Sequence, residues 1–383
     1  MHIIALENEP TSLRGGQHFN LLEICCALSQ RGHTTSLLYT KEGNLLKYYH
    51  DFCSYTVKVD KYAITKKIDI FKLIVDVWKI NCNIPNIKNS IVFSNQYQDS
   101  LFGSMLAFSK NIPFVCYLQQ PPPKEFPGQW TVGLKGVKQL IAVSNQTKLD
   151  WVKSGFKEEK INVVYNGTNL EIFKPSSEFS AIRKEWDIPE DTRVISYVGR
   201  LDKEKGLETL IKAFALLLKS GTNARLLIAG KPVLQGEEYK RALEQMSIDL
   251  GIEKYVSFLG HVDNTTSIYQ VSDVTVLPCL WSEPFGRTII ESMACGTPVV
   301  ASRTGGIPEN LTGEFQSGLF DPGNEQALSD TLNQFMNWRD KDPHLGERCR
   351  EHVLGKFTLD KVVDGIEKSL LRVLNNEEAI AAH

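Results

Sequence analysis

The chain has 383 residues, of which 42% are apolar and 23% are charged, a composition typical of soluble proteins that fold around a hydrophobic core. This length exceeds what one ordinary core organises and suits two domains of about 150–200 residues each. Lysine and arginine number 43 against 45 acidic residues, a net charge of −2 that disfavours a dedicated nucleic-acid binder.

No apolar run approaches the roughly 18 residues that a membrane-crossing helix needs, and the apolar start Met1–Leu6 is too short for a signal peptide. The eight cysteines contain no Cys-x-x-Cys pair, so the sequence predicts neither a zinc site nor a disulfide framework. We therefore expect a cytoplasmic protein with reduced thiols.

The first half of the chain alternates strand and helix patterns. The first strand is followed by a polar loop with Gly15-Gly16 and by a helical pattern over His18–Gln30. Repeated β-α-β patterns predict a parallel sheet covered by helices on both faces. The strands predicted in this half are His2–Leu6, Thr34–Tyr39, Ser90–Ser94, Phe114–Leu118 and Gln139–Ser144.

The segment Lys58–Lys79 stands out by its charge. It holds six lysines against three aspartates, and apolar residues recur in it at helical spacing: Ile68, Phe71, Val75 and Trp78. A basic amphipathic helix of this kind can rest on an anionic membrane surface. The commoner alternative is a surface helix that packs its apolar stripe inward.

A linker is predicted over Asn166–Pro189, which is rich in Asn, Gly, Pro and Ser. The strands predicted after it are Val194–Val198, Ala224–Gly230, Tyr255–Gly260, Asp273–Pro278 and Pro298–Ser302. The helices predicted after it are Lys205–Lys219, Glu237–Gly251, Thr288–Cys295, Glu325–Trp338 and Thr358–Asn375. The fold prediction is two doubly wound α/β domains that face each other across a cleft.

Two carboxylates flank one predicted strand-to-helix turn. Glu283 lies in the loop, and Glu291 follows eight residues later, about one turn inside the helix. Gly286 lets backbone N–H groups approach a ligand, and the helix N-terminus favours an anion there. These carboxylates suit the hydroxyls of a sugar, although two solvated glutamates beside a buried helix fit the spacing equally well.

Two cations, Arg200 and Lys205, follow the first strand of the second half, where open α/β sheets bind ligands. They suit a diphosphate, although a solvated loop is a common alternative. The one D-x-D motif, Asp340-Lys-Asp342, follows a helix and not a strand, and the histidines have no zinc-ligand spacing. His261 by itself is most simply a loop residue. Gly15-Gly16 lacks the full G-x-G-x-x-G pattern, so no dinucleotide cofactor is expected.

Taken together, these residues resemble the retaining GT-B glycosyltransferases of family 4. In the second half the resemblance rests on Gly199-Arg-Leu with Lys205-Gly206, Glu283-Pro-Phe-Gly, Glu291-Ser-Met-Ala-Cys-Gly-Thr-Pro-Val-Val, Gly305-Gly-Ile-Pro-Glu and Gly318-Leu-Phe-Asp-Pro-Gly-Asn. In the first half it rests on Arg14-Gly-Gly, Arg31-Gly-His33, Ala142-Val-Ser, Asn166-Gly and Phe173-Lys-Pro. It implies two Rossmann-like domains: an acceptor-side domain over 1–168, onto which a C-terminal helix of about 362–383 packs, and a donor-binding domain over 169–361.

The resemblance also implies roles for individual residues. Arg200 and Lys205 would hold the donor diphosphate and stabilise the leaving group, Glu283 would contact the transferred sugar, and Glu291 would bind the ribose hydroxyls. The other donor-binding residues that it implies are Gly16, Gly199, His261, Val262, Phe285, Gly286, Arg287 and Thr288. No metal and no further cofactor are expected.

Two positions depart from the family pattern. Gln119 stands where a histidine usually touches the donor sugar, and because glutamine carries no charge, only a neutral sugar contact is expected there. Asn169 stands where the linker motif usually has an aspartate, a change expected to affect only a cap or turn.

The expected activity is that of a retaining hexosyltransferase. It would move a sugar to a glycan or lipid-linked acceptor in envelope or exopolysaccharide synthesis. The single expected donor is UDP-glucose, which would supply glucose. The alternatives are a non-catalytic GT-B partner subunit, a nucleotide-sugar epimerase, or a sucrose- or trehalose-type phosphorylase. We expect a monomer or weak dimer in the cytoplasm, with peripheral contact to the inner face of the membrane through Lys58–Lys79 as an alternative. Replacing Glu283 or Lys205 by alanine should abolish most transfer and leave the fold intact.

Overall fold

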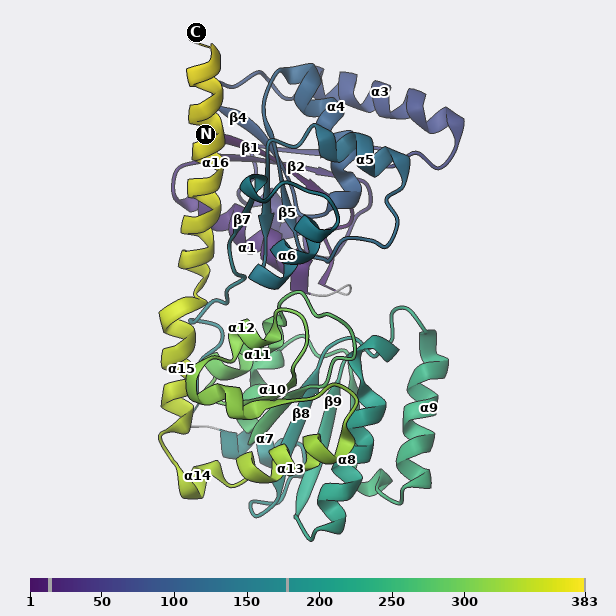
Figure 1. The fold of residues 1–383 in the computed structure, drawn as a ribbon, viewed down its shortest axis with the longest axis vertical. Coiled ribbons are helices and arrows are strands. Elements are labelled where there is room, and N and C mark those ends of the chain that lie inside the picture. The colour runs from purple at the N-terminus through teal and green to yellow at the C-terminus, as the bar shows by residue number, and fades with distance from the viewer. Residues whose placement is uncertain (13–15, 177–178, 382–383) are drawn as a thin grey trace. The chain divides into compact units, whose positions relative to one another are not determined.

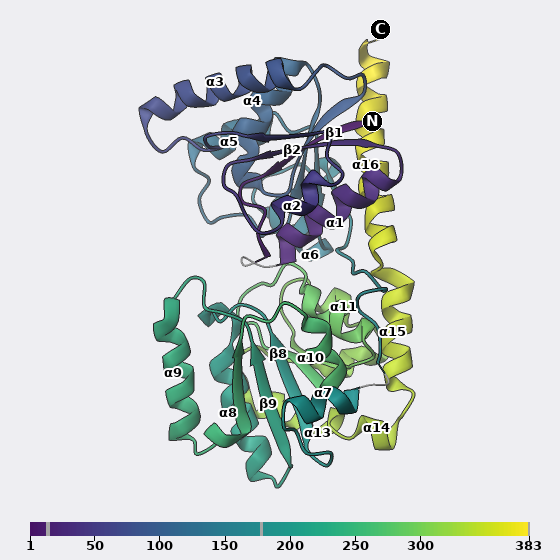
Figure 2. The same ribbon diagram turned by 180° about the vertical axis from the view of Figure 1, so that it is seen from behind.

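The computed structural model describes residues 1–12, 16–176 and 179–381. The chain divides into unit 1, Met1–Asn166 with Leu359–His383, and unit 2, Gly167–Thr358. Each unit is a parallel sheet packed between helices (Figures 1 and 2). This architecture confirms the prediction of two doubly wound α/β domains.

Unit 1 contains a seven-stranded parallel sheet in the order β3-β2-β1-β4-β5-β6-β7. Every residue of β1, β4 and β5 is buried, which explains why their sequences are continuous apolar runs. The strands are β1 (His2–Glu7), β2 (Thr34–Tyr39), β3 (Tyr55–Lys58), β4 (Ser90–Ser94), β5 (Phe114–Leu118), β6 (Gln139–Ala142) and β7 (Ile161–Val163). The α-helices are α1 (Gly16–Gln30), α2 (Leu46–His50), α3 (Lys67–Asn83), α4 (Ser100–Lys110), α5 (Gly128–Lys135), α6 (Asn145–Lys153) and α16 (Leu359–Ala381).

The last helix of the chain, α16, packs against α1 and β6 of unit 1. Its Glu367 carboxylate accepts hydrogen bonds from Arg31 (Nη1–Oε2 2.7 Å) and His33 (Nε2–Oε1 2.6 Å). These two residues belong to the Arg31-Gly-His33 motif of the sequence, which therefore has a structural role in holding α16 on unit 1.

Unit 2 contains a six-stranded parallel sheet in the order β10-β9-β8-β11-β12-β13. Its core joins the sheet to α8, α9 and α13 through large apolar side chains such as Phe214, Leu243 and Leu332. The strands are β8 (Arg193–Val198), β9 (Ala224–Ala229), β10 (Val256–Gly260), β11 (Val274–Leu277), β12 (Val299–Ser302) and β13 (Leu319–Phe320). The α-helices are α7 (Phe179–Glu185), α8 (Leu207–Lys219), α9 (Gly236–Asp249), α10 (Thr265–Val271), α11 (Arg287–Ala294), α12 (Ile307–Asn310), α13 (Glu325–Phe335), α14 (Trp338–Lys341) and α15 (Leu345–Lys356).

Three local predictions need correction. The expected linker Asn166–Pro189 is not continuously irregular, because α7 lies within it. Lys205 belongs to a 3₁₀ turn, Lys203–Lys205, because the left-handed Gly206 separates it from α8. The helix predicted over Glu325–Trp338 is two helices, α13 and α14.

The chain passes between the units at 166/167 and 358/359, against predicted boundaries at 168/169 and 361/362. The first difference has a backbone cause, since the Thr168 amide donates to the Phe357 carbonyl (2.9 Å) and ties Thr168 to unit 2. Among the described helices, none combines the length and apolar character that crossing a bilayer requires.

Candidate functional site

The sheet of unit 2 reverses its strand order between β8 and β11. Loops that leave two such neighbouring strands run in opposite directions, so they open a crevice at the carboxyl edge of the sheet, where open α/β sheets bind ligands. The loop after β8 carries Arg200 and Lys205, and the loop after β11 carries Glu283. The topology therefore brings together predicted residues that lie about 80 positions apart in the chain.

A close backbone approach joins these two loops. The amide of Leu280 donates to the Glu204 carbonyl (2.8 Å). Gly206 has φ +71°, and a Cβ there would collide with the Pro278 carbonyl oxygen. A glycine at this position thus lets the Lys205 side chain reach the second loop.

Lys205 and Glu283 form the centre of the site. Lys205 Nζ lies 2.5 Å from Glu283 Oε2, and both side chains are largely buried, with 12% and 13% exposed. Trp281 Nε1 (3.1 Å) and Cys279 Sγ (3.5 Å) donate to the same oxygen, and Lys205 Nζ also lies 5.2 Å from the centre of the Trp281 ring. All three donors end on Oε2, which leaves Oε1 to accept a hydrogen bond from a ligand.

Burial and charge act in opposite directions on this pair. Burial raises the pKa of Glu283, but the Lys205 charge and the three hydrogen bonds to this carboxylate together outweigh burial, so the pKa lies below its ordinary value. Burial likewise lowers the pKa of Lys205, and the Glu283 carboxylate outweighs it, so that pKa is raised. Both groups therefore stay charged at neutral pH. Burial raises the pKa of Cys279 far above neutral, so its thiol is a neutral donor.

Arg200 is held at the edge of the same loop by two carboxylates. Its Nη1 lies 3.1 Å from Asp202 Oδ2, and its Nη2 donates to Glu204 Oε1 (2.7 Å). Asp202 is fully buried and also accepts from the backbone of the loop after β9, at Val233 and Leu234. Glu204 is partly exposed, so a phosphate group can compete with it for the guanidinium.

The other predicted carboxylate, Glu291, lies on α11, whose N-cap is Gly286 in the left-handed region (φ +86°). The Tyr269 hydroxyl donates to Glu291 Oε2 (3.0 Å), and Arg287 Nε lies 3.3 Å from Oε1. Burial, followed by the Glu291 charge, raises the pKa of Tyr269 well above its ordinary value, so this hydroxyl remains a donor. Thr288 Oγ1 donates to the Val198 carbonyl (3.2 Å) and fixes the start of α11 beside the end of β8.

The Gly305-Gly306 motif supports the loop that carries Glu283. The Gly306 amide donates to the Glu283 carbonyl (2.8 Å), and a Cβ on Gly305 would collide with the Glu283 backbone. Asn310 Nδ2 donates to the carbonyl of the buried Phe285 (2.5 Å). The contacts of this motif thus hold the Glu283 loop in place.

His261 and Val262 follow β10 at the same edge of the sheet. His261 Nε2 lies 3.2 Å from the exposed Asp263 carboxylate. The Gly260 carbonyl accepts from the Gly230 amide (2.7 Å), and a Cβ on Gly230 would collide with the Gly199 carbonyl. Glycines thus draw the ends of β8, β9 and β10 together.

Unit 1 has a polar cluster of its own at the carboxyl edge of its sheet. Gln119, after β5, exchanges hydrogen bonds with the Asn166 amide at 3.1 and 3.4 Å. Asn166 also accepts from Tyr117 (2.8 Å) and Asn20 (2.8 Å). The position where the family has a histidine is thus built into an amide network.

Sequence reasoning missed a buried pair at the same edge of the sheet of unit 1. His18 Nδ1, in the first turn of α1, lies 2.9 Å from Glu7 Oε1 at the end of β1. Both side chains are buried, and the place of His18 two positions after the glycine pair was the available signal. Gly16 is the first residue of α1, whereas Arg14 and Gly15 of the predicted motif lie outside the described residues.

Trp281, Cys279 and Tyr269 were missed as well. Only Trp281 had a signal, since it stands two positions before Glu283. The contacts of Cys279 and Tyr269 depend on how strands and helices meet.

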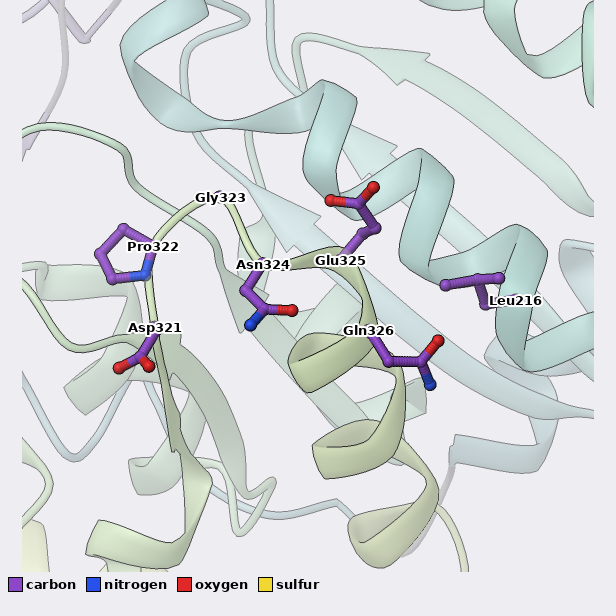
Figure 3. Close-up of a pocket in the computed structure, with 7 residues that line it drawn as sticks. All are labelled: Leu216, Asp321, Pro322, Gly323, Asn324, Glu325 and Gln326. Carbon is purple, nitrogen blue, oxygen red and sulfur yellow. The ribbon is translucent and has the colours of Figure 1, made fainter.

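Unit 2 has two other polar regions. An open hollow of about 730 Å³ is lined by Leu216 and the segment 321–326, where Asn324 Oδ1 caps α13 by accepting from the Ala327 amide (Figure 3). None of the predicted donor-binding residues lines it.

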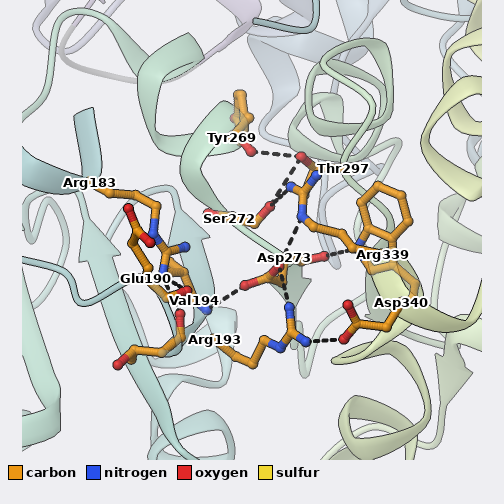
Figure 4. Close-up of polar contacts among 12 residues, drawn as sticks. Arg183, Glu190, Arg193, Val194, Tyr269, Ser272, Asp273, Thr297, Arg339 and Asp340 are labelled. Atoms are coloured by element: carbon orange, nitrogen blue, oxygen red, sulfur yellow. Dashed lines mark hydrogen bonds and ion pairs between the residues drawn. The ribbon is translucent and has the colours of Figure 1, made fainter. Parts of the chain in front are cut away.

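The second region surrounds Asp273 at the amino ends of β8 and β11, the edge of the sheet opposite the candidate site (Figure 4). The buried Asp273 accepts from the Val194 amide (2.8 Å) and from Arg339 Nε (3.0 Å). Asp340, from the D-x-D motif, pairs there with Arg193, and Asp342 pairs with Arg348. Among the residues that the structure describes, no three His, Cys, Asp or Glu side chains gather as a metal site would require.

Two family models match adjacent parts of the chain. "Glycosyltransferase Family 4" matches residues 14–172, and "Glycosyl transferases group 1" matches residues 178–352. Together the two matches span most of the chain.

Curated relatives match at moderate identity. The D-inositol 3-phosphate glycosyltransferase of Corynebacterium urealyticum is 34% identical over 222 residues, 56% of this chain and 52% of the relative. The N-acetyl-alpha-D-glucosaminyl L-malate synthase of Bacillus anthracis is 29% identical over 218 residues, 57% of this chain and 55% of the relative. The chain thus spans about half the length of these relatives.

Solved structures match over nearly the whole length. HepE of Anabaena in complex with UDP and glucose has a TM-score of 0.82 at 22% identity, and the match covers 96% of this chain and 98% of HepE. The sucrose-phosphate synthase of Thermosynechococcus elongatus has a TM-score of 0.78 at 22% identity over the full length of both chains. These matches establish the GT-B fold.

Proposed function

Because the chain belongs to the family 4 glycosyltransferases, we propose that it transfers a sugar from a UDP-sugar to a glycan or lipid-linked acceptor, with retention of anomeric configuration. UDP-glucose is our single candidate for the donor, and envelope or exopolysaccharide synthesis is the setting that we propose. HepE, which shares the fold, was crystallised with UDP-glucose, and this supports a uridine donor.

One observation carries the proposal: Arg200, Lys205 and the Glu283 carboxylate converge where the strand order of unit 2 reverses. Two cations at such a crevice suit the two negative charges of a departing diphosphate. The N-terminus of α11 favours an anion at the same edge. Glu291, held by Tyr269, offers a carboxylate to a vicinal diol such as that of ribose.

Each of these residues has a separate role in the proposed transfer step. Lys205 and Arg200 stabilise the charge that grows on the diphosphate as the bond between the anomeric carbon and the phosphate oxygen breaks. The acceptor hydroxyl attacks that carbon from the face that the diphosphate leaves, and its proton passes to a leaving phosphate oxygen. Glu283 Oε1 accepts from a hydroxyl of the transferred sugar. The two cations supply the charge neutralisation, and the proposal includes no metal.

A thermal-shift panel tests the donor class. UDP, ADP, GDP and their glucose or mannose conjugates are added in the presence of a chelator. A ligand at about 100 times its dissociation constant stabilises the native state by about 2.7 kcal/mol, a shift of a few degrees for a chain of this size. We expect UDP and one UDP-sugar to give this shift, Lys205→Ala to abolish it, and the control Lys254→Ala to retain it, because Lys254 precedes β10 at the opposite edge.

The other outcomes separate the alternatives. A preference for ADP or GDP would refute the uridine donor and keep the site. The absence of any nucleotide shift would favour a non-catalytic partner subunit. Conversion of the donor sugar without acceptor would favour an epimerase, and a requirement for free phosphate would favour a phosphorylase.

A further inference from the structure

Helix α3 exposes apolar side chains that a surface helix normally buries. The sequence predicted an apolar stripe on this segment, and the structure turns most of it outward: Phe71 is 64% exposed and Trp78 66%. The other exposed apolar residues of α3 are Ile68, Ile70 and Ile74. The expectation that the stripe packs inward is therefore wrong, and the helix that carries it spans Lys67–Asn83.

A second apolar stripe explains this orientation. Leu73, Val77 and Ile80 are the buried apolar residues of α3 and join the core of unit 1. At 100° per residue, Leu73 and Ile80 lie nearly opposite Phe71 and Trp78 on the helix. Figures 1 and 2 show α3 along the margin of unit 1, next to α4, with no other helix of that unit outside it.

The charges of α3 are sorted between the same two sides. Both of its carboxylates are buried: Asp69 accepts from the Thr65 and Lys66 amides (2.7 Å each) and pairs with Lys61 (2.9 Å), and Asp76 accepts from the Asp60 amide (2.7 Å). They serve to fix the loop that precedes the helix.

The lysines remain at the surface. Lys66, Lys67, Lys72 and Lys79 are all exposed. Lys72 pairs with Asp60 and Lys79 with Asp76. The exposed side of the helix is therefore apolar with a basic margin.

We propose that the outer face of α3, defined as Ile68, Ile70, Phe71, Ile74 and Trp78 with the four lysines, docks on an anionic lipid surface. A helix with this composition lies in the plane of the interface, with its apolar side chains among the upper acyl chains. Tryptophan is favoured at that depth, and lysines extend their ammonium groups to anionic headgroups. Docking of this kind does not depend on the proposed transfer activity.

Charge decides against a second copy of the chain as the occupant. In a symmetric dimer the same surface meets itself, so the basic margins of two copies would face each other. Lys72 and Lys79 are paired with Asp60 and Asp76, but residues 58–79 hold six lysines against three aspartates, so a net positive charge remains on this side of unit 1. An anionic membrane supplies the missing negative charge.

Vesicle sedimentation of the full chain tests the proposal. Vesicles of phosphatidylcholine alone are compared with vesicles that also contain phosphatidylglycerol. We expect binding only to the anionic vesicles, weakened by salt, and a fall in partitioning of roughly tenfold or more in Phe71→Ser/Trp78→Ser. Lys66→Glu/Lys67→Glu should lose binding too. The matched control is Ile248→Ser on α9, which removes an apolar side chain of similar exposure from unit 2.

Three results would overturn the proposal. They are wild-type protein that stays in the supernatant with anionic vesicles, α3 variants that sediment like the wild type, and equal binding to both kinds of vesicle. Gel filtration tests the remaining occupant. A wild-type protein that does not bind vesicles and is a dimer, with the dimer lost in Phe71→Ser/Trp78→Ser, would show that a second copy covers this face. A far-UV circular dichroism spectrum and a thermal unfolding transition like those of the wild type would confirm that the α3 variants are folded.

Discussion

Removing Lys205 alone should destabilise unit 2 more than the sequence suggested. Its ammonium lies 2.5 Å from Glu283 Oε2, and both side chains are close to nine-tenths buried. Removing one partner of a buried ion pair costs about 3–5 kcal/mol, because the other charge is left without a counter-ion. Removing both charges avoids that penalty, so we expect the double variant Lys205→Met/Glu283→Gln to lose less than the sum of the two single losses.

The expected effect is large enough to measure. A loss of about 3 kcal/mol corresponds to a fall in melting temperature of about 6–12 °C for a domain the size of unit 2. Each single variant should therefore remain folded at room temperature, and scanning calorimetry measures the shift. The single and double variants form a double-mutant cycle. Its coupling energy, the difference between the loss in the double variant and the sum of the two single losses, should lie between about 1 and 3 kcal/mol.

A surface pair provides the matched control. Lys240 Nζ lies 3.3 Å from Glu244 Oε1 on α9, and both side chains are more exposed than those of the Lys205–Glu283 pair. An exposed i,i+4 pair is worth about 0.3–0.5 kcal/mol, so the same cycle on this pair should give little coupling.

The pH dependence has a definite sign. The pKa of Glu283 is lower in the folded protein than in the unfolded chain, where it is about 4.3. Its contribution to stability is therefore present above that value and is lost as pH falls through the lower folded pKa. The stability difference between wild type and Lys205→Met should shrink in acid. Single variants as stable as the wild type, or losses that simply add, would refute the buried-pair argument.

Three further variants test other contacts of unit 2. Trp281→Phe keeps an aromatic ring and removes the N–H donated to the carboxylate, so kcat should fall roughly tenfold with little change in KM; an unchanged kcat would contradict this positioning role. Gly206→Ala should destabilise unit 2 well beyond the left-handed strain of about 1–2 kcal/mol, because its Cβ would meet the Pro278 carbonyl. Gly221→Ala, which is equally left-handed but has open space, is its control in urea denaturation, and equal losses would exclude the collision. Asp273→Asn should lower stability by about 2–4 kcal/mol and leave the nucleotide-induced shift unchanged, since it lies at the opposite edge; loss of that shift in folded protein would contradict this separation.

The sequence predicted best where burial alone determines structure. Strands β2, β4 and β5 begin and end where predicted, because their apolar and β-branched residues are typical of strands in a buried parallel sheet. The short strands β3, β7 and β13 were missed, because two to four residues carry too little pattern of their own. They become strands by pairing with a neighbour that is already in place.

Helix α3 shows what a pattern leaves open. Its sequence is apolar on two opposite sides, and either side satisfies a helical period. The choice was made by tertiary contacts, since Asp69 and Asp76 fix the preceding loop and bring Leu73 and Ile80 to the core. Periodicity identifies a helix and cannot by itself say which of two apolar sides is buried.

The candidate site also has a part that the sequence predicts and a part that depends on tertiary contacts. Residue types and spacing marked Arg200, Lys205, Glu283 and Glu291 as candidates, because loops at the carboxyl end of parallel strands are places where ligands bind. Spacing fitted solvated surface charges as well, and only the resemblance to family 4 gave the four residues their expected roles. The three donors on a single oxygen of Glu283 became visible only in the folded chain. Their positions depend on the reversal of strand order between β8 and β11, which sets the two loops side by side. The sequence determined which groups are available, and the tertiary structure determined which of them meet.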